Sequence, residues 1–211
     1  MKKISFSERY GLQQAVLNGT KTMTRRIVPI GLYNQTDWKA VEEGDYEAVV
    51  DGNGDYHDIR CCGRYRIGEE VAIAQAYNTL RWPSVPGIDW DAIVDEVTHA
   101  KGWKNKMFVK AKYMPHRIRI TDIRVERLRD ISYDECMKEG VYKYDNPPLY
   151  HEFDPYAPWP PYVKPYKRDY DNLRYYCNPF AAFGALINRI SGRGTWQRNP
   201  WVFVYEFELI K

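Results

Sequence analysis

The sequence lacks the features that would place it in or across a membrane. No uninterrupted apolar run approaches the roughly 20 residues that a membrane-spanning helix needs. The N-terminal segment MKKISFSERY has two lysines but no apolar stretch behind them, so we expect no signal peptide. No segment repeats at a fixed period. We therefore expect a cytoplasmic protein that does not contact a membrane.

Cysteine and histidine are scarce and poorly spaced for a metal. The four cysteines stand at positions 61, 62, 136 and 177, and none belongs to a CxxC pair. Adjacent cysteines rarely bond to each other, which favours reduced thiols. The histidines at 57, 99 and 151 show no metal-ligand spacing. We expect no metal ion and no cofactor.

Length and composition are those of one folded domain. The 211 residues are 44% hydrophobic and 28% charged, with a formal net charge of +3. Such a chain can bury a core of its own. We expect a single domain over residues 1–211, with an acidic insertion at about 31–58 and a second insertion at 142–176. The second holds nine of the 18 tyrosines and seven of the 13 prolines, and is structured by aromatic packing or partly mobile.

Charge is unevenly distributed along the chain. Residues 37–58 contain eight acids and one lysine, a local net charge of −7. Residues 101–129 contain ten bases and two acids, a local net charge of +8. A basic stretch with aromatic neighbours could follow a phosphate backbone. A solvated strand face is the alternative explanation.

Helices and strands are both predicted, without a regular βαβ alternation. Each of the three expected helices has a capping signal. Ser5 or Ser7 precedes a helix that ends at Gly19, and the Ser132–Glu135 capping box opens a helix that stops at Gly140. Asn178 and Pro179 suit the start of a third helix.

The strand signals come from alternation of apolar and polar residues. Residues 201–209 alternate as a half-buried terminal strand. The apolar residues of 118–125 change phase, which predicts a bulge near Thr121–Asp122. Val71 with Ile73, and Phe108 with Val109, mark shorter strands. Together these patterns predict a mixed α+β fold: a small β-barrel with peripheral short helices.

A polar cluster follows the first predicted helix. Lys21, Thr22, Thr24, Arg25 and Arg26 bring two hydroxyls and three cations together. Such groups suit a phosphate, a carbonyl oxygen or a nucleobase edge. An exposed edge strand kept soluble by its cations is the other explanation.

The pattern Gly19-x-Lys21-x-x-Thr24-x-Arg26 resembles the G-x-K-x-x-[polar]-x-R signature of the ASCH domain (activating signal cointegrator homology), a member of the PUA-like β-barrels. Further segments resemble the phage and prophage version of that domain, in the family's order: 68–71, 114–118, 125–128, 131–140 and 196–201. The resemblance spans nearly the whole chain outside the two insertions. It implies a PUA-like barrel with a pocket for RNA or a modified nucleoside.

Bacterial ASCH proteins similar in this motif are N4-acetylcytidine amidohydrolases, so the resemblance also implies catalytic roles. Thr24 would be the nucleophile, Lys21 the proton acceptor and Glu139 the proton donor. A lysine can accept a proton only if its pKa is lowered, which nearby arginines and partial burial would do. Residues 21 and 24 of a regular strand point to opposite faces, so the segment must turn if both reach one pocket.

The remaining candidate ligand contacts are Gly19, Arg25, Arg26, Gln75, His116 and Arg117. Relatives carry a Lys/Arg-Glu pair where this chain has Ala74-Gln75, which removes two charges and indicates a changed ligand or reaction if the pair lines the pocket. Three functions follow. The first is binding of RNA or a modified nucleoside, the second is hydrolysis of an N-acyl group on cytidine or a related base, and the third is ribonuclease activity.

Overall fold

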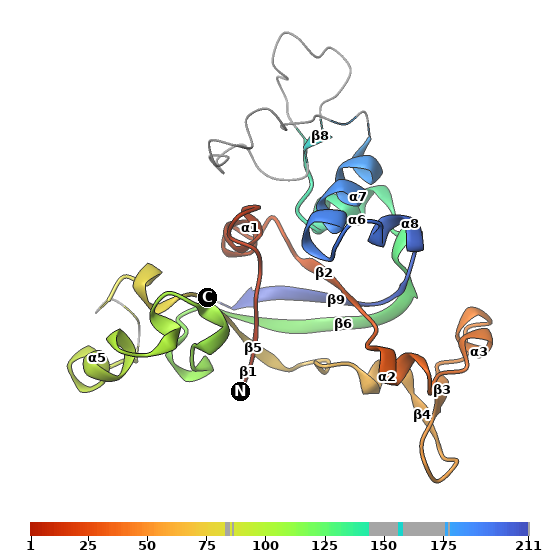
Figure 1. The fold of residues 1–211 in the computed structure, drawn as a ribbon, viewed down its shortest axis with the longest axis horizontal. Coiled ribbons are helices and arrows are strands. Elements are labelled where there is room, and N and C mark those ends of the chain that lie inside the picture. The colour runs from red at the N-terminus through yellow and green to blue at the C-terminus, as the bar shows by residue number, and fades with distance from the viewer. Residues whose placement is uncertain (83–84, 86, 144–155, 158–175, 177, 211) are drawn as a thin grey trace.

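The computed structural model describes residues 1–82, 85, 87–143, 156–157, 176 and 178–210 (Figure 1). Most of the tyrosine- and proline-rich stretch, together with Cys177, lies outside the described residues, so the two alternatives for that stretch remain predictions. In the described part of the chain, no helix is long and apolar enough to cross a membrane.

The central element is a five-stranded, mainly antiparallel sheet. Its strands follow the order β1 (Lys2–Ile4), β5 (Glu70–Ile73), β6 (Arg117–Arg127), β9 (Trp201–Ile210) and β2 (Met23–Ile27). β1 pairs with β5 in parallel, and the other neighbours are antiparallel. The mixed α+β class is therefore confirmed. The predicted barrel is not, because among the described strands β1 and β2 form two separate edges and the sheet does not close.

Short helices surround the sheet, and two small hairpins lie away from it, one beside α3 and one beside α7 (Figure 1). The helices are α1 (Leu12–Leu17), α2 (Ile30–Tyr33), α3 (Trp38–Glu42), α4 (Ile59–Cys62), α5 (Trp90–Thr98), α6 (Tyr133–Lys138), α7 (Pro179–Ile190) and α8 (Thr195–Arg198). The hairpins are β3 (Glu47–Val50) with β4 (Tyr56–Asp58), and β7 (Tyr142–Lys143) with β8 (Tyr156–Ala157). Short 3-10 turns lie at 77–79, 101–103, 106–108, 111–113 and 128–130.

The long β6–β9 ladder contains the predicted bulge. The register shifts between Ile120 and Asp122, so Thr121 is the extra residue on β6. This shift explains why the apolar residues of β6 change phase at that point, because an inserted residue exchanges the two faces of the strand. The apolar pattern of β6 thus predicted both the strand and its irregularity.

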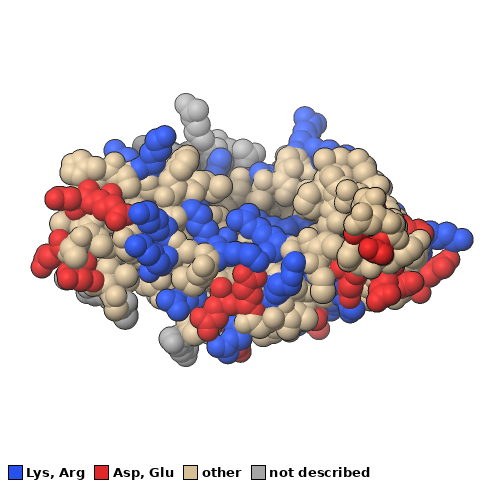
Figure 2. Space-filling model, turned by 90° about the horizontal axis from the view of Figure 1, so that it is seen from below, with Lys and Arg blue, Asp and Glu red and all other residues tan. Residues whose placement is uncertain are grey.

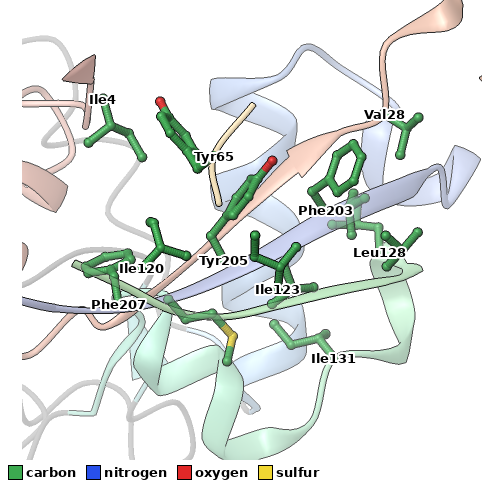
Figure 3. Packing of buried hydrophobic residues seen from close by; sticks show 14 of the residues in the cluster. Ile4, Val28, Tyr65, Ile120, Ile123, Leu128, Ile131, Phe203, Tyr205 and Phe207 are labelled. Carbon is green, nitrogen blue, oxygen red and sulfur yellow. The ribbon is translucent and has the colours of Figure 1, made fainter. Parts of the chain in front are cut away.

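β9 is buried more deeply than its alternation predicts. All five residues from Trp201 to Tyr205 are buried, and the chain alternates with exposed positions only near the end of the strand. Phe203, Tyr205 and Tyr65 lie together on one side of β9 (Figure 3). On the other face, Val204 lies opposite Arg25, which contacts Phe183 of α7. The expectation of a half-buried strand is wrong for this part because both faces of the sheet are covered.

All three predicted helices are present, but the serine cap predicted for the first is wrong. The Ser132–Glu135 capping box opens α6, and the side chain of Asn178 accepts the Ala181 amide at the start of α7. α1 begins instead after Gly11, whose φ is +64°, and no side chain caps it. Neither Ser5 nor Ser7 is the cap, because the chain between them and α1 turns once more before the helix starts.

The strand predicted at Phe108 and Val109 is also wrong. Lys106–Phe108 is a 3-10 turn in which the Asn105 side chain accepts the Met107 amide. Val109 is buried, but in a separate cluster with Tyr77 and Tyr113. The apolar pair Phe108 and Val109 therefore predicted that this segment is buried in part, but it did not predict the backbone conformation.

The acidic segment forms α3 and the β3–β4 hairpin at one end of the molecule (Figure 1). Several of its acids have local structural roles. Asp37 caps α3, Asp58 caps α4 and pairs with Arg60, and Asp51 closes the hairpin turn. Trp38 stacks on Trp201 with ring centroids 4.6 Å apart, which joins the segment to the start of β9.

We predict that Ser132→Ala will destabilise the protein by about 1 kcal/mol, because an N-cap serine satisfies a helix amide that no helical carbonyl can reach. Denaturant unfolding measures this loss. Asp134→Asn is the control, since Asp134 lies in the same helical turn and is exposed. Equal stability of Ser132→Ala and wild type would contradict the assigned cap.

Candidate functional site

Lys21 and Thr24 reach the same region because the chain turns before β2 begins. Gly19 has a φ of +75°, and the backbone amides of Thr20 and Lys21 both donate to the Ala15 carbonyl. Lys21 therefore precedes the strand, while Thr24 lies within it. Because of this turn, residues 21 and 24 do not belong to one regular strand, so their side chains need not point to opposite faces. Gly19 contributes to the site through this turn.

Lys21 and Glu139 form a buried ion pair. The Lys21 side chain is 2% exposed and that of Glu139 is 5% exposed, and their Nζ–Oε2 distance is 2.7 Å. Lys21 Nζ also donates to the Met23 carbonyl at 2.6 Å and the Glu139 carbonyl at 2.7 Å. The three protons of the ammonium group are thus matched by three acceptors, which offsets the cost of its burial.

α6 positions Glu139 for this contact. Glu139 is the C-terminal cap of α6, and Gly140 follows it with a φ of +101°. A Cβ at Gly140 would lie 3.0 Å from Leu12 Cδ2 and 3.6 Å from Lys21 Cδ. Both the backbone conformation and this close approach favour glycine at position 140.

Arg25 extends the network from β2 to three carboxylates. It contacts Glu139 Oε1 at 3.3 Å, Glu135 Oε2 at 3.0 Å and Glu126 Oε1 at 2.6 Å. Its side chain is 1% exposed. Arg124 adds a second cation to Glu135 at 2.6 Å. The network joins β2, β6 and α6, so it fixes the edge strand against the helix layer.

Burial dominates the pKa of Lys21. Loss of solvent lowers the pKa of the lysine, the Glu139 carboxylate opposes that shift, and Arg26 and Arg25 lower the pKa further. The net direction is downward, as the sequence predicts, although burial is a larger cause than the arginines. Burial also raises the pKa of the neighbouring Cys136 thiol to about 12, which keeps that thiol protonated.

A cavity of about 220 Å³ lies over this network, and we call it the Thr24 cavity. Its polar lining consists of Lys21, Thr24, Arg25, Arg26 and Glu139, with Ser5, Ser7 and Ser191 at other positions. Its apolar lining includes Phe6, Leu12 and the α7 residues Phe183, Leu186, Ile187 and Ile190. Within the described part of the chain, the Thr24 hydroxyl makes no hydrogen bond, so it can bond to a ligand.

A second cavity of about 430 Å³ adjoins the first, and we call it the Tyr65 cavity. Tyr65, Phe203 and Tyr205 line it, and Figure 3 shows these rings on the same side of β9. Lys3 and Arg64 add two cations. Ser5, Arg26 and Ile27 line both cavities, so the two are neighbours along β2.

Three of the predicted ligand contacts lie elsewhere. Arg117 pairs with Glu70 at 3.6 Å on an exposed part of the sheet. His116 directly precedes β6, its carbonyl accepts the Ile73 amide, and burial lowers the pKa of its imidazole. Gln75 is buried beyond the end of β5, and its Oε1 has no hydrogen-bond partner in the described residues. None of the three lines the Thr24 or the Tyr65 cavity.

The basic stretch 101–129 is largely neutralised by acids from other segments. Lys106 pairs with Glu8, Lys110 with Glu96, Arg117 and Arg119 with Glu70, Arg124 with Glu135, and Arg127 with Glu42. A continuous phosphate-binding track along this stretch therefore has no support. Figure 2 shows instead that lysine and arginine gather across the middle of one face, with acidic groups toward both ends and another directly below the central basic patch.

Sequence reasoning missed Lys3, Arg64 and Tyr65 as site residues. They come from β1 and from the segment after α4, which lie far from residue 24 in the sequence. The run Arg64-Tyr65-Arg66 was a weak local signal, because it alternates cations with an aromatic residue. Within the described residues, no group of three or more His, Cys, Asp or Glu side chains is placed to share a metal ion.

Comparisons with protein families, with curated proteins and with solved structures find no match for this chain.

We predict that Lys21→Met will lower the free energy of unfolding by about 3 kcal/mol, because it removes one partner of a buried ion pair. Chemical denaturation measures the change. Lys39→Met is the matched control: Lys39 is 84% exposed, contacts Glu43 at 3.8 Å, and should leave stability essentially unchanged. Equal effects of the two substitutions would contradict a structural role for the Lys21–Glu139 pair.

We also predict that Glu135 makes stability depend on pH in the acid range. Burial raises the pKa of this carboxyl, but the Ser132 amide, Arg25 and Arg124 outweigh burial and hold the pKa below its ordinary value of 4.5. A carboxyl with a lowered pKa in the folded state stabilises it above pH 4.5, and that stability is lost as pH falls through the folded-state pKa.

Glu135→Gln should therefore cost about 1–3 kcal/mol at pH 7, and the difference from wild type should shrink below pH 4.5. Unfolding measured at a series of pH values tests this. Glu43→Gln is the control, because Glu43 is exposed. A difference from wild type that stays constant between pH 7 and pH 3 would disprove the linkage.

Proposed function

We propose that this chain binds RNA or a modified nucleoside in the Thr24 cavity. The observation that carries the proposal is convergence: Lys21, Thr24 and Arg26, spaced along one motif, line a single cavity with Glu139, which is more than a hundred residues away. Three of these four residues are the polar positions of the ASCH-like signature. A PUA-like origin of the fold belongs to the same proposal.

The lining suits a flat heterocycle with a polar edge. Phe183, Leu186 and Ile187 of α7 form an apolar wall, and Phe6 lies among the other apolar lining residues. The Thr24 hydroxyl can donate to or accept from a base edge, and Arg26 can donate to a carbonyl or phosphate oxygen. Apolar walls with a few fixed polar groups are typical of small-ligand sites. Recognition of RNA commonly uses such contacts to single, unstacked bases.

The geometry favours binding over hydrolysis. Lys21 Nζ already donates to three acceptors, so it has no lone pair available for the Thr24 proton. Both Glu139 carboxylate oxygens accept from cations, Oε2 from Lys21 and Oε1 from Arg25. Glu139 could deliver a proton to a leaving nitrogen only after one of these bonds breaks.

An amidohydrolase is the second candidate, because Thr24, Lys21 and Glu139 line the same cavity. In that reaction Lys21 must first pass a proton to Glu139, which leaves a neutral amine and a carboxylic acid. Thr24 Oγ1 then bonds to the acyl carbon while its proton passes to the Lys21 amine. The carbon–nitrogen bond breaks as the base nitrogen takes the Glu139 proton, and water later cleaves the acyl-threonine ester. No histidine is among the described residues that line the two cavities, so no observation favours the ribonuclease alternative.

Isothermal titration calorimetry with cytidine, uridine, adenosine, guanosine and N4-acetylcytidine tests the proposal. We expect at least one nucleoside to bind, and Thr24→Val to weaken its binding about five- to tenfold, because one hydrogen bond is lost. Thr22→Val is the matched control: it lies two residues earlier and does not line the cavity. Absence of binding by all five nucleosides, or equal effects of the two variants, would contradict the proposal.

The same samples separate the two candidates. Release of cytidine from N4-acetylcytidine by the wild type, with none by Thr24→Val, would establish the hydrolase. Binding of N4-acetylcytidine without release of cytidine would leave the cavity as a binding site.

A further inference from the structure

The Tyr65 cavity concentrates positive charge without compensation. Lys3, Arg26 and Arg64 line it, and no Asp or Glu is among its described lining residues. None of the three cations forms an ion pair within the described residues, in contrast to Lys21 and Arg25 next door. Positive groups that meet in a concave site without a carboxylate attract an anion, because the walls of a cleft focus the field of the charges that line it.

The bonds of Lys3 and Arg26 show how these two cations are held in place. Lys3 Nζ donates to the carbonyls of Met107 and Val109 at 2.7 and 2.6 Å, and Arg26 Nη2 donates to the Ser5 carbonyl at 2.9 Å. Each of these groups keeps further N–H donors for a ligand. Burial lowers the pKa of Lys3, and Arg64 lowers it further, as expected for like charges with no anion between them.

The floor of the same cavity is aromatic. Tyr65 and Tyr205 meet edge to face with ring centroids 5.2 Å apart, and Tyr205 stacks on Phe203 at 5.9 Å (Figure 3). Bonds to the backbone hold both tyrosines, because Tyr65 Oη donates to the Lys3 carbonyl and Tyr205 Oη accepts the Arg64 amide. An apolar floor beneath basic side chains matches a ligand that has both a ring and a phosphate.

Arg26 connects this cavity to the Thr24 cavity. Ser5, Arg26 and Ile27 line both, and Arg26 is the cation that the two share. A single nucleoside would occupy about 220 Å³ on one side of Arg26 and leave about 430 Å³ unfilled on the other. Two consecutive nucleotides would place one base in each cavity and the phosphodiester between them beside the Arg26 guanidinium, which binds phosphate well.

We therefore propose that the Tyr65 cavity is a second nucleotide subsite and that the ligand is a single-stranded segment of at least two nucleotides. This inference rests on the proposed function, since it takes the Thr24 cavity as the first subsite. It deepens that function because it names the ligand class: a single-stranded nucleic acid and not a free nucleoside.

Titration calorimetry at low salt tests the inference with the four common ribonucleosides, the dinucleotides CpC, UpU, ApA and GpG, and inorganic phosphate. We expect the best dinucleotide to bind at least tenfold more tightly than its nucleoside. That gain should fall as salt is raised, because part of it comes from contacts to phosphate. Inorganic phosphate alone should bind much more weakly than the dinucleotide.

Arg64→Ala identifies the subsite. Arg64 is exposed, so the variant should fold, which thermal unfolding verifies. It should remove most of the gain of the dinucleotide over the nucleoside and leave nucleoside affinity unchanged. Arg60→Ala is the matched control, because Arg60 is an exposed arginine four residues earlier, pairs with Asp58, and lines neither cavity. We expect it to change neither affinity.

The outcomes separate this inference from the proposed function. Suppose that nucleosides bind and that their binding depends on Thr24. If the dinucleotide then binds no more tightly, or if Arg64→Ala leaves its gain in affinity intact, the second subsite alone is overturned. Absence of binding by every nucleoside and dinucleotide overturns both. Dinucleotide binding that depends on Arg64 but not on Thr24, or phosphate binding as tight as that of the dinucleotide, overturns the two-subsite arrangement.

Discussion

The buried contact between Lys21, Glu139 and Arg25 is the interaction on which the rest of the site depends. Two charged side chains that are 2% and 5% exposed are tolerable only because Lys21 donates to a carboxylate and two carbonyls, and Glu139 accepts from two cations. The contact holds the edge strand β2 against α6 and sets the floor of the Thr24 cavity. It also occupies the atoms that a lysine base and a glutamic acid would need for catalysis. One arrangement therefore stabilises the fold and supports the proposal of binding over that of hydrolysis.

The coverage of the sheet explains where the two cavities lie. α7 covers one face of β9 near Val204 and Arg25, and the segment after α4 covers the other face over Phe203 and Tyr205. β2 is an edge strand, so side chains from both of its faces reach the same border of the sheet. Arg25 enters the ion network, while Arg26 lines both cavities. The adjacent arginines thus have different roles because the strand directs them to opposite faces.

Charge along the chain was a poor guide to charge on the surface. The stretch 101–129 has a local net charge of +8, yet acids from outside it pair with six of its ten basic side chains. The cations that remain without carboxylates at a cavity come from β1, β2 and the segment after α4. A run of like charges in sequence is spread over several elements by folding, so its field is decided by which acids become its neighbours.

The sequence alone determined the features that depend on local geometry. The α6 capping box, the start of α7, the bulge in β6 and the terminal strand follow from residues within a few positions of one another, and all four are present. The motif from Gly19 to Arg26 also indicated the region of the Thr24 cavity. Tertiary structure decided that the sheet stays open, that both faces of β9 are buried, that Glu139 meets Lys21, and that Lys3, Arg64 and Tyr65 share a cavity. These facts depend on contacts between residues far apart in the chain, and no local pattern records which distant side chain will become a neighbour.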